Sequence, residues 1–199
     1  MASIGKEGGK AIKGDVTKAA EAKAIIEAAI EKFGRLDILV NNSGVYEFGA
    51  IEAVTPENFH RMFDTNVLGL LLATQAAVKH MSAGASIINI GSGISSLTPP
   101  NSAVYTATKA AVDAITGVLA KELGAKQIRV NSINPGMVET EGTHTAGFIG
   151  SDFEKGLVAQ TPLGRIGQPE EIASVAAFLA SENSAWVTGE KIVVGGGLH

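Results

Sequence analysis

A serine, a tyrosine and a lysine, whose side chains suit proton transfer, are spaced along residues 86–109. Ser92 lies in a Gly-Ser-Gly turn, and Tyr105 and Lys109 follow it, four residues apart. On a helix that spacing puts both side chains on one face, one turn from each other. A tyrosine titrates near ~10, too high for an efficient base at neutral pH, and a neighbouring ammonium lowers that pKa. The trio therefore predicts proton transfer to or from an alcohol or a carbonyl, with Ser92 hydrogen-bonded to the reacting oxygen.

The elements around these residues indicate how the chain positions them. Ile87–Ile90 is a short apolar run typical of a buried strand, and Ser92 follows its carboxyl end. After a Pro-Pro loop, residues 103–123 have the pattern of a helix that carries Tyr105 and Lys109. Open α/β sheets bind ligands at the carboxyl ends of their strands, so we expect the trio at the mouth of a binding site. The tyrosine–lysine pair alone is also compatible with an ordinary surface helix, and the serine at a strand end favours catalysis.

The rest of the chain alternates strand and helix patterns without hairpin signals, which predicts a parallel α/β sheet. Apolar runs predict strands at residues 36–40, 128–133 and 191–194, and at most a very short one at Ala11–Lys13. Amphipathic or capped segments predict helices at residues 19–33, 56–81, 151–160 and 169–180, and residues 134–150 are expected to form an irregular loop. Because no repeat or linker divides the sequence, we expect a single domain over residues 1–199.

The composition excludes several other classes of protein. Of the 199 residues, 45% are hydrophobic and 18% charged, the balance of a globular chain. A net charge of −4 argues against nucleic acid as a partner, which requires clustered Lys and Arg. With no cysteine, and with His60, His80 and His199 scattered, we predict neither a disulfide nor a metal site. The longest strongly apolar stretch, residues 67–78, is too short to span a membrane, and the N-terminus lacks a signal peptide, so we expect a cytoplasmic protein.

Four motifs together give the sequence a family resemblance. They are S-x12-Y-x3-K from Ser92 to Lys109, N-N-S-G at Asn41–Gly44, N-V-L-G at Asn66–Gly69, and N-P-G-M-V-E-T at Asn134–Thr140. In this order and spacing the chain resembles a classical short-chain dehydrogenase/reductase from about Gly14 to the C-terminus. The resemblance implies a Rossmann-like, doubly wound parallel sheet and an oxidoreductase that depends on NAD or NADP. Such an enzyme transfers a hydride between its nicotinamide and a small-molecule alcohol or carbonyl substrate.

The resemblance also implies a role for each catalytic side chain. Tyr105 moves the proton, Lys109 lowers the pKa of that tyrosine and binds the nicotinamide ribose, and Ser92 positions the substrate oxygen. Asn66 holds a water that links Lys109 to bulk solvent. An amide inside an apolar helix is costly unless it is hydrogen-bonded, so a structural bond from Asn66 to a neighbouring carbonyl is compatible with this role.

The cofactor contacts that the resemblance implies mostly follow the predicted strands. Asp15 and Val16 correspond to the pair that touches the adenine ring, and the Asn134–Thr140 loop to the nicotinamide contacts. The implied residues are Asp15, Val16, Asn42, Ser43, Gly44, Tyr105, Lys109, Pro135, Gly136, Val138 and Thr140. Residues 141–160 correspond to the substrate lid, with Phe148, Phe153 and glycine hinges. His144 in that loop is either a second acid/base or, as the sequence favours, an exposed loop histidine.

One part of the family pattern is missing from this sequence. Family members open with a strand, a Gly-rich turn, a helix and a second strand, and we expect this first βαβ unit to be absent, so that the fold is truncated at its N-terminus. The loss would expose an apolar edge of residues 36–40 and remove the turn that binds the pyrophosphate. Binding of NAD or NADP is then expected to be weak or absent.

Three explanations of that gap stay open. The sequence is a fragment; or it is complete, and Met1–Asp15 or a partner chain covers the exposed edge; or it is a non-catalytic relative. The intact catalytic set favours the first two. The alternative function is a cofactor-free, catalytically impaired interaction protein of the same fold. In either case the helices at 56–81 and 103–123 resemble the family's dimer interface, so we expect a homodimer or homotetramer.

Overall fold

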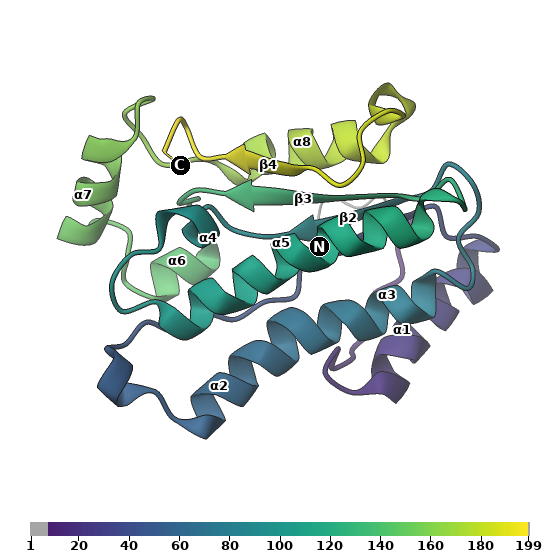
Figure 1. Cartoon of the computed structure of the whole chain (residues 1–199), viewed down its shortest axis with the longest axis horizontal. Coiled ribbons are helices and arrows are strands. Elements are labelled where there is room, and N and C mark those ends of the chain that lie inside the picture. The colour runs from purple at the N-terminus through teal and green to yellow at the C-terminus, as the bar shows by residue number, and fades with distance from the viewer. Residues whose placement is uncertain (1–7, 199) are drawn as a thin grey trace.

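Residues 8–198 of the chain are described by a computed structural model, in which four parallel strands carry helices on both faces (Figure 1). The strands lie in the sheet in sequence order: β1 (Ile38–Asn41), β2 (Ser86–Ile90), β3 (Arg129–Pro135) and β4 (Lys191–Val194). Ile38 lies opposite Ser86, and Ser86 opposite Arg129. The two central strands are almost wholly buried, as expected for a sheet covered on both sides. The prediction of a Rossmann-like parallel sheet is confirmed.

Two apolar clusters attach the helices to the two faces of the sheet. Ile87 and Ile88 are consecutive in β2, so their side chains point to opposite faces. The first cluster joins α1 (Ala19–Phe33), α3 (Gly69–Ala77) and α5 (Ala103–Gly124) to the sheet, and its buried members include Ile26, Ala76, Ala120, Ile87 and Val130. The second joins α8 (Pro169–Ala180) to the opposite face through Leu179, Ile88 and Ile133. These buried contacts fix the strands whose carboxyl ends carry the candidate site.

Most of the predicted helix limits are confirmed, because local signals set them. The helices are α1 (Ala19–Phe33), α2 (Pro56–Phe63), α3 (Gly69–Ala77), α4 (Ile94–Leu97), α5 (Ala103–Gly124), α6 (Glu141–Thr145), α7 (Asp152–Gln160) and α8 (Pro169–Ala180), with single 3-10 turns at Ile51–Ala53 and Glu182–Ser184. Gly34 ends α1 at φ +76°, in the left-handed region that glycine favours. Pro56 begins α2, where the Thr55 hydroxyl accepts a hydrogen bond from the Asn58 N–H at 3.2 Å.

The long helix predicted at 56–81 is interrupted by one π-helical segment, Asp64–Leu68, between α2 and α3. A π turn has one residue more than an α turn, so it changes which side chains face the interior, and such turns are frequent at functional sites. Asn66 lies in this segment, and its side chain is buried.

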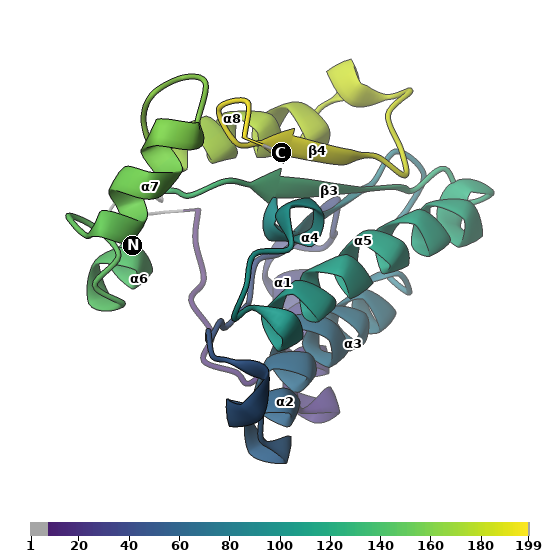
Figure 2. The ribbon, with the colours of Figure 1, turned by 60° about the vertical axis from the view of Figure 1, so that its left-hand side comes forward.

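Three local predictions differ from the structure. Ala11–Lys13 forms no strand. The loop at 134–150 contains α6, because Thr140 and Thr143 form reciprocal side-chain-to-backbone hydrogen bonds at the start of that helix. A short helix, α4, follows Ser92, where we predicted a loop. In Figures 1 and 2, α6 and α7 lie beyond the carboxyl ends of the strands, as a lid over that edge would.

β1 is an edge strand among the described residues, and two of its apolar side chains are open to solvent. Ile38 is 43% and Val40 46% exposed, whereas Leu39 between them is buried. Residues 8–15 form no strand along this edge, and the remainder of the Met1–Asp15 segment that we considered as a cover lies outside the described residues, as does His199. None of the helices within residues 8–198 has the length and apolar character needed to cross a lipid bilayer.

Candidate active site

A cavity of about 620 Å³ lies at the carboxyl ends of the central strands. Asn42 follows β1, Ser92 follows β2 and Gly136 follows β3, and all three line it. Its volume is within the range of small-molecule sites, and its place is where open parallel sheets bind ligands. The alternation of strands and helices therefore brings the predicted motifs to one site.

The structure gathers most, but not all, of the residues predicted for the site. Those that line the cavity are Asn42, Gly44, Ser92, Tyr105, Lys109, Pro135, Gly136, Val138 and Thr140. Asp15, Val16, Ser43 and Asn66 are not among the residues that line it. The hydroxyl of Thr140 also caps α6, by accepting a hydrogen bond from the Thr143 N–H at 3.2 Å.

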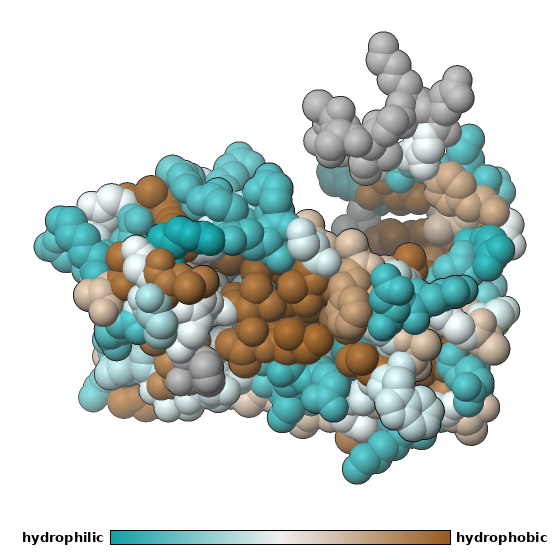
Figure 3. All heavy atoms as spheres, turned by 90° about the horizontal axis from the view of Figure 1, so that it is seen from above, coloured by the Kyte–Doolittle hydropathy of each residue, from teal (hydrophilic) through white to brown (hydrophobic). Residues whose placement is uncertain are grey.

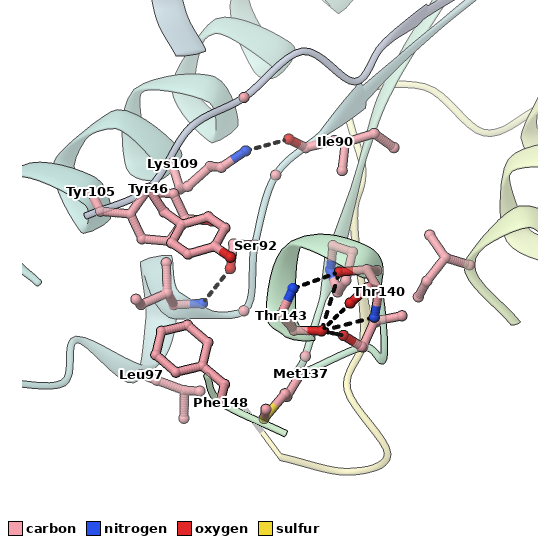
Figure 4. A pocket seen from close by; sticks show the side chains of 18 of the residues that line it. Tyr46, Ile90, Ser92, Leu97, Tyr105, Lys109, Met137, Thr140, Thr143 and Phe148 are labelled. Atoms are coloured by element: carbon pink, nitrogen blue, oxygen red, sulfur yellow. Dashed lines mark hydrogen bonds between the residues drawn. The ribbon is translucent and has the colours of Figure 1, made fainter. Parts of the chain in front are cut away.

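Ser92, Tyr105 and Lys109, which we call the polar wall, point into the cavity from neighbouring elements (Figure 4). The Lys109 ammonium donates a hydrogen bond to the Ile90 carbonyl at 2.8 Å, and it lies 5.9 Å from the centre of the Tyr105 ring. The Ser92 hydroxyl accepts a hydrogen bond from the Ile94 N–H at 3.2 Å, and its proximity lowers the pKa of Tyr105. The three side chains thus line the same cavity.

Burial shifts the pKa values of the tyrosine and the lysine in opposite directions. It lowers the pKa of Lys109 to about 8, against the opposing charge of Asp113. Burial raises the pKa of Tyr105, more than Ser92 lowers it, and the nearby Tyr46 adds to the rise. Lys109 is not among the causes of this net shift, so a lowering of the pKa of Tyr105 by Lys109 stays a prediction. At neutral pH, Tyr105 carries its proton.

Asp113 connects the segments of the polar wall, and the sequence analysis missed it. Its carboxylate accepts hydrogen bonds from the Ser95 hydroxyl at 2.7 Å and from the Asn134 amide at 3.0 Å. Ser95 belongs to α4 beside Ser92, and Asn134 to β3, so one side chain of α5 ties two strand ends together. The available signal was a carboxylate four residues after Lys109, on the same helical face.

The Asn66 side chain binds the backbone that follows β1 and one hydroxyl of α5. Its side-chain oxygen accepts from the Val45 N–H at 2.8 Å, and its amide donates to the Val45 carbonyl at 2.8 Å and to the Thr108 hydroxyl at 3.0 Å. The structural role that we weighed for Asn66 is therefore observed. Gly44 separates Asn66 from Lys109: a Cβ there would lie 3.5 Å from the Asn66 oxygen and 3.7 Å from the Lys109 nitrogen.

Asp15 and Val16 pack away from the cavity. The Asp15 carboxylate accepts hydrogen bonds from the Thr17 N–H and hydroxyl, which lower the pKa of Asp15. Val16 lies against α3, where a Cβ on Gly69 would come within 2.6 Å of its side chain. In this structure both residues support the entry to α1.

Four aromatic rings line the cavity beside Tyr105: Tyr46, Phe48, Phe148 and Phe153, which we call the aromatic wall. Their centres lie 5.3–6.2 Å from their neighbours, within the range of aromatic contacts. Phe148 and Phe153 were expected in the lid, whereas Tyr46 and Phe48 were missed, although they directly follow the N-N-S-G turn. His144 is not part of this wall; it contacts Glu139 at 3.1 Å, with half of its side chain exposed.

Comparisons with known proteins show the family. The whole chain, residues 1–199, matches the family described as enoyl-(acyl carrier protein) reductase. It is 61% identical to an uncharacterised oxidoreductase of Methylorubrum extorquens, over 99% of this chain and 80% of that protein. It is 37% identical to a hydroxynaphthalene reductase-like protein of Metarhizium anisopliae, over 98% of this chain and 78% of that one.

A solved structure gives the same assignment from the fold. A gluconate 5-dehydrogenase from Burkholderia cenocepacia, in complex with NADP and tartrate, superposes with a TM-score of 0.87 at 36% identity, covering 92% of this chain and 72% of that chain. The chain belongs to the short-chain dehydrogenase/reductase family, whose members are nicotinamide-dependent oxidoreductases.

Proposed function

We propose that this protein interconverts an alcohol and a ketone or aldehyde, with Ser92, Tyr105 and Lys109 as its catalytic residues. The observation that carries the proposal is the convergence of a phenol, a hydroxyl and an ammonium on one wall of a single cavity. Family membership supports a nicotinamide as the hydride carrier.

The residues that would hold the nicotinamide end of NAD or NADP fit that group. Gly136 and Val138 follow β3 at the cavity, and Lys109 faces them from α5. The adenine end has fewer residues to hold it, because Asp15 and Val16 are not among the residues that line the cavity. We therefore propose that the cofactor is held chiefly at its nicotinamide end, and weakly.

In the reductive direction, Tyr105 is protonated at neutral pH and would act as the acid. A bound reduced nicotinamide supplies the hydride to the carbonyl carbon. Ser92 holds the carbonyl oxygen, and the Tyr105 phenol gives that oxygen its proton as the C–H bond forms, leaving an alcohol and a phenolate. The Lys109 ammonium, inside the same cavity, stabilises the phenolate. A water between Asn66 and Lys109, at the space that Gly44 leaves, would return a proton from solvent.

The test is the Tyr105→Phe variant with ketone substrates and both NADH and NADPH. Removing the acid is expected to lower kcat by roughly 10²–10⁴, with an unchanged circular dichroism spectrum. Retained turnover would refute the assignment of Tyr105. Titration of NADH and NADPH by calorimetry separates the alternative, a cofactor-free interaction protein, because that protein would bind neither at millimolar concentration.

We also propose a homodimer or homotetramer built on α2, α3 and α5. These helices expose apolar side chains, among them Phe59, Leu71 and Val118, which is 54% exposed. Figure 3 shows a second apolar area, on the side of the molecule that carries α8 and β4. Light scattering tests the first surface: Leu71→Arg is expected to lower the mass, and a wild type of monomer mass would contradict the proposal.

A further inference from the structure

The cavity is lined almost entirely by uncharged groups, which restricts the substrates that it can bind. Among the described residues that line it, Lys109 alone carries a charge, and its ammonium is buried against the Ile90 carbonyl. No Arg among those residues is available to pair with a carboxylate or a phosphate of a substrate. A charged substrate group would lose its hydration in this cavity without gaining a partner.

Aromatic rings surround the catalytic Tyr105. Tyr46 and Phe48 lie 6.0 and 5.8 Å from the Tyr105 ring, centre to centre, so they flank the proton donor directly. Phe148 stacks against Tyr46 at 6.0 Å with an angle of 29° between the ring planes. A carbonyl held at Tyr105 would therefore have aromatic side chains as its neighbours in the cavity.

Tyr46 offers its ring rather than its hydroxyl. That hydroxyl already donates a hydrogen bond to the Gly142 carbonyl of α6 at 2.8 Å. A polyol substrate needs several side-chain donors and acceptors, and the aromatic wall provides this one hydroxyl, which is occupied. Aromatic contacts instead favour flat apolar groups, which pack face to face or edge to face.

From these contacts we infer that the substrate is a neutral ketone whose carbonyl is attached to a flat aromatic or fused ring, and that Tyr46 and Phe48 select that ring. This inference rests on the proposed function, because it takes Tyr105 as the group beside the carbonyl. It extends that proposal from a reaction to a substrate class.

The experiment compares three ketones: 1-tetralone, a fused aromatic ring; 2-decanone, an open chain with the same number of carbons; and levulinate, a charged ketone. We expect kcat/KM for 1-tetralone to exceed that for 2-decanone by about tenfold, and levulinate to be the poorest. Tyr46→Ala and Phe48→Ala should reduce the tetralone-to-decanone ratio several-fold. Phe33→Ala is the matched control, because Phe33 is exposed at the end of α1, outside the cavity, and the ratio should not change.

The outcomes separate this inference from the proposed function. A preference for 2-decanone or levulinate, or an equal loss for all three ketones in Tyr46→Ala, would overturn the substrate class while the oxidoreductase proposal stands. If no ketone is reduced, saturation-transfer NMR on the Tyr105→Phe variant decides the question without turnover. Binding of 1-tetralone that weakens in the double variant with Tyr46→Ala then supports the ring site, and equal binding of all three ketones refutes it.

Discussion

The two walls of the cavity are built by different forces. In the polar wall, hydrogen bonds to the backbone hold Ser92 and Lys109, and Asp113 behind that wall accepts a bond from Asn134. In the aromatic wall the rings are held by packing, and a single hydrogen bond, from Tyr46 to Gly142, joins them to the lid. Hydrogen bonds fix direction and packing fixes volume, so the first wall suits proton transfer and the second suits selection by shape.

Because of this difference, burial destabilises the groups of the polar wall more than it destabilises the rings of the aromatic wall. A buried ammonium and a buried phenol lose hydration, which is visible in their opposite pKa shifts. The rings lose little by being enclosed, and Phe153 at the rim remains half exposed. Substitutions in the polar wall should therefore change stability and pH dependence, whereas those in the aromatic wall should change substrate preference.

The largest expected effect is a pH-dependent cost of burying Lys109. Its pKa falls from 10.5 to about 8 on folding, so below pH 8 the charged form is buried at full cost. Between about pH 8 and 10.5 the folded chain releases this proton while the unfolded chain keeps it, so stability rises with pH, by roughly 3 kcal/mol in all. Urea unfolding of wild type and Lys109→Met across this range should show the gain in the wild type alone.

If the free energy of unfolding changed with pH in the same way in both proteins, the Lys109 ammonium would be hydrated. The proposed difference between the two walls would then be contradicted. Lys109→Met is a suitable reference because methionine fills a similar volume without a charge.

A steric test of the polar wall is Gly91→Ala. A Cβ at Gly91 would lie 2.2 Å from the Asn134 side-chain oxygen and 2.7 Å from the Ser132 hydroxyl, so buried groups have to move. We expect a loss of ~1–3 kcal/mol in the free energy of unfolding, as for other overpacked sites. Gly156→Ala is the control: nothing lies within 4 Å of its Cβ, and alanine within α7 should add ~0.5–1 kcal/mol. If Gly91→Ala were as stable as the wild type, the groups at the end of β2 would be able to move apart at little cost.

The Asp113→Asn variant tests whether the charge of Asp113 raises the pKa of Lys109. The variant removes the charge that raises the pKa of Lys109, and it keeps one of the two carboxylate oxygens that accept from Ser95 and Asn134. The alkaline limb of the kcat/KM profile should then move to lower pH, and the melting temperature should fall because a hydrogen bond is lost. Asp152→Asn on the exposed surface of α7 should leave the profile in place. A uniform loss at every pH would assign Asp113 a purely structural role.

The sequence predicted the features of the fold and the site that depend on local backbone preferences. Gly34 and Pro56 mark helix limits through their own backbone preferences, and Ser92 reaches the cavity because it follows a strand of a parallel sheet. The pKa direction of Tyr105 and the bonds of Asp113 could not be predicted, since they depend on burial and on partners distant in the chain. The spacing of the motifs thus predicted which groups react, but not their pKa values.

The adenine contacts stay a prediction. Asp15 and Val16 were assigned through resemblance alone, with no pattern of their own beyond the entry to a helix. In the structure that entry accounts for both residues, since Asp15 binds Thr17 and Val16 packs on Gly69. Tyr46 was missed because a single aromatic residue after a turn has no distinctive spacing, and its role depends on rings contributed by the lid.

The smallest effect expected is that of Tyr46→Phe, which keeps the ring and removes the bond to Gly142. The loss of one hydrogen bond near the surface should cost ~0.5–1.5 kcal/mol of lid closure, so KM should rise severalfold with kcat nearly unchanged. The tetralone-to-decanone ratio should persist, because the ring faces remain, whereas Tyr46→Ala should lower it. If Tyr46→Phe instead changed the ratio as much as Tyr46→Ala, the hydroxyl rather than the ring would be selecting the substrate. The aromatic wall would then depend on hydrogen bonds, as the polar wall does.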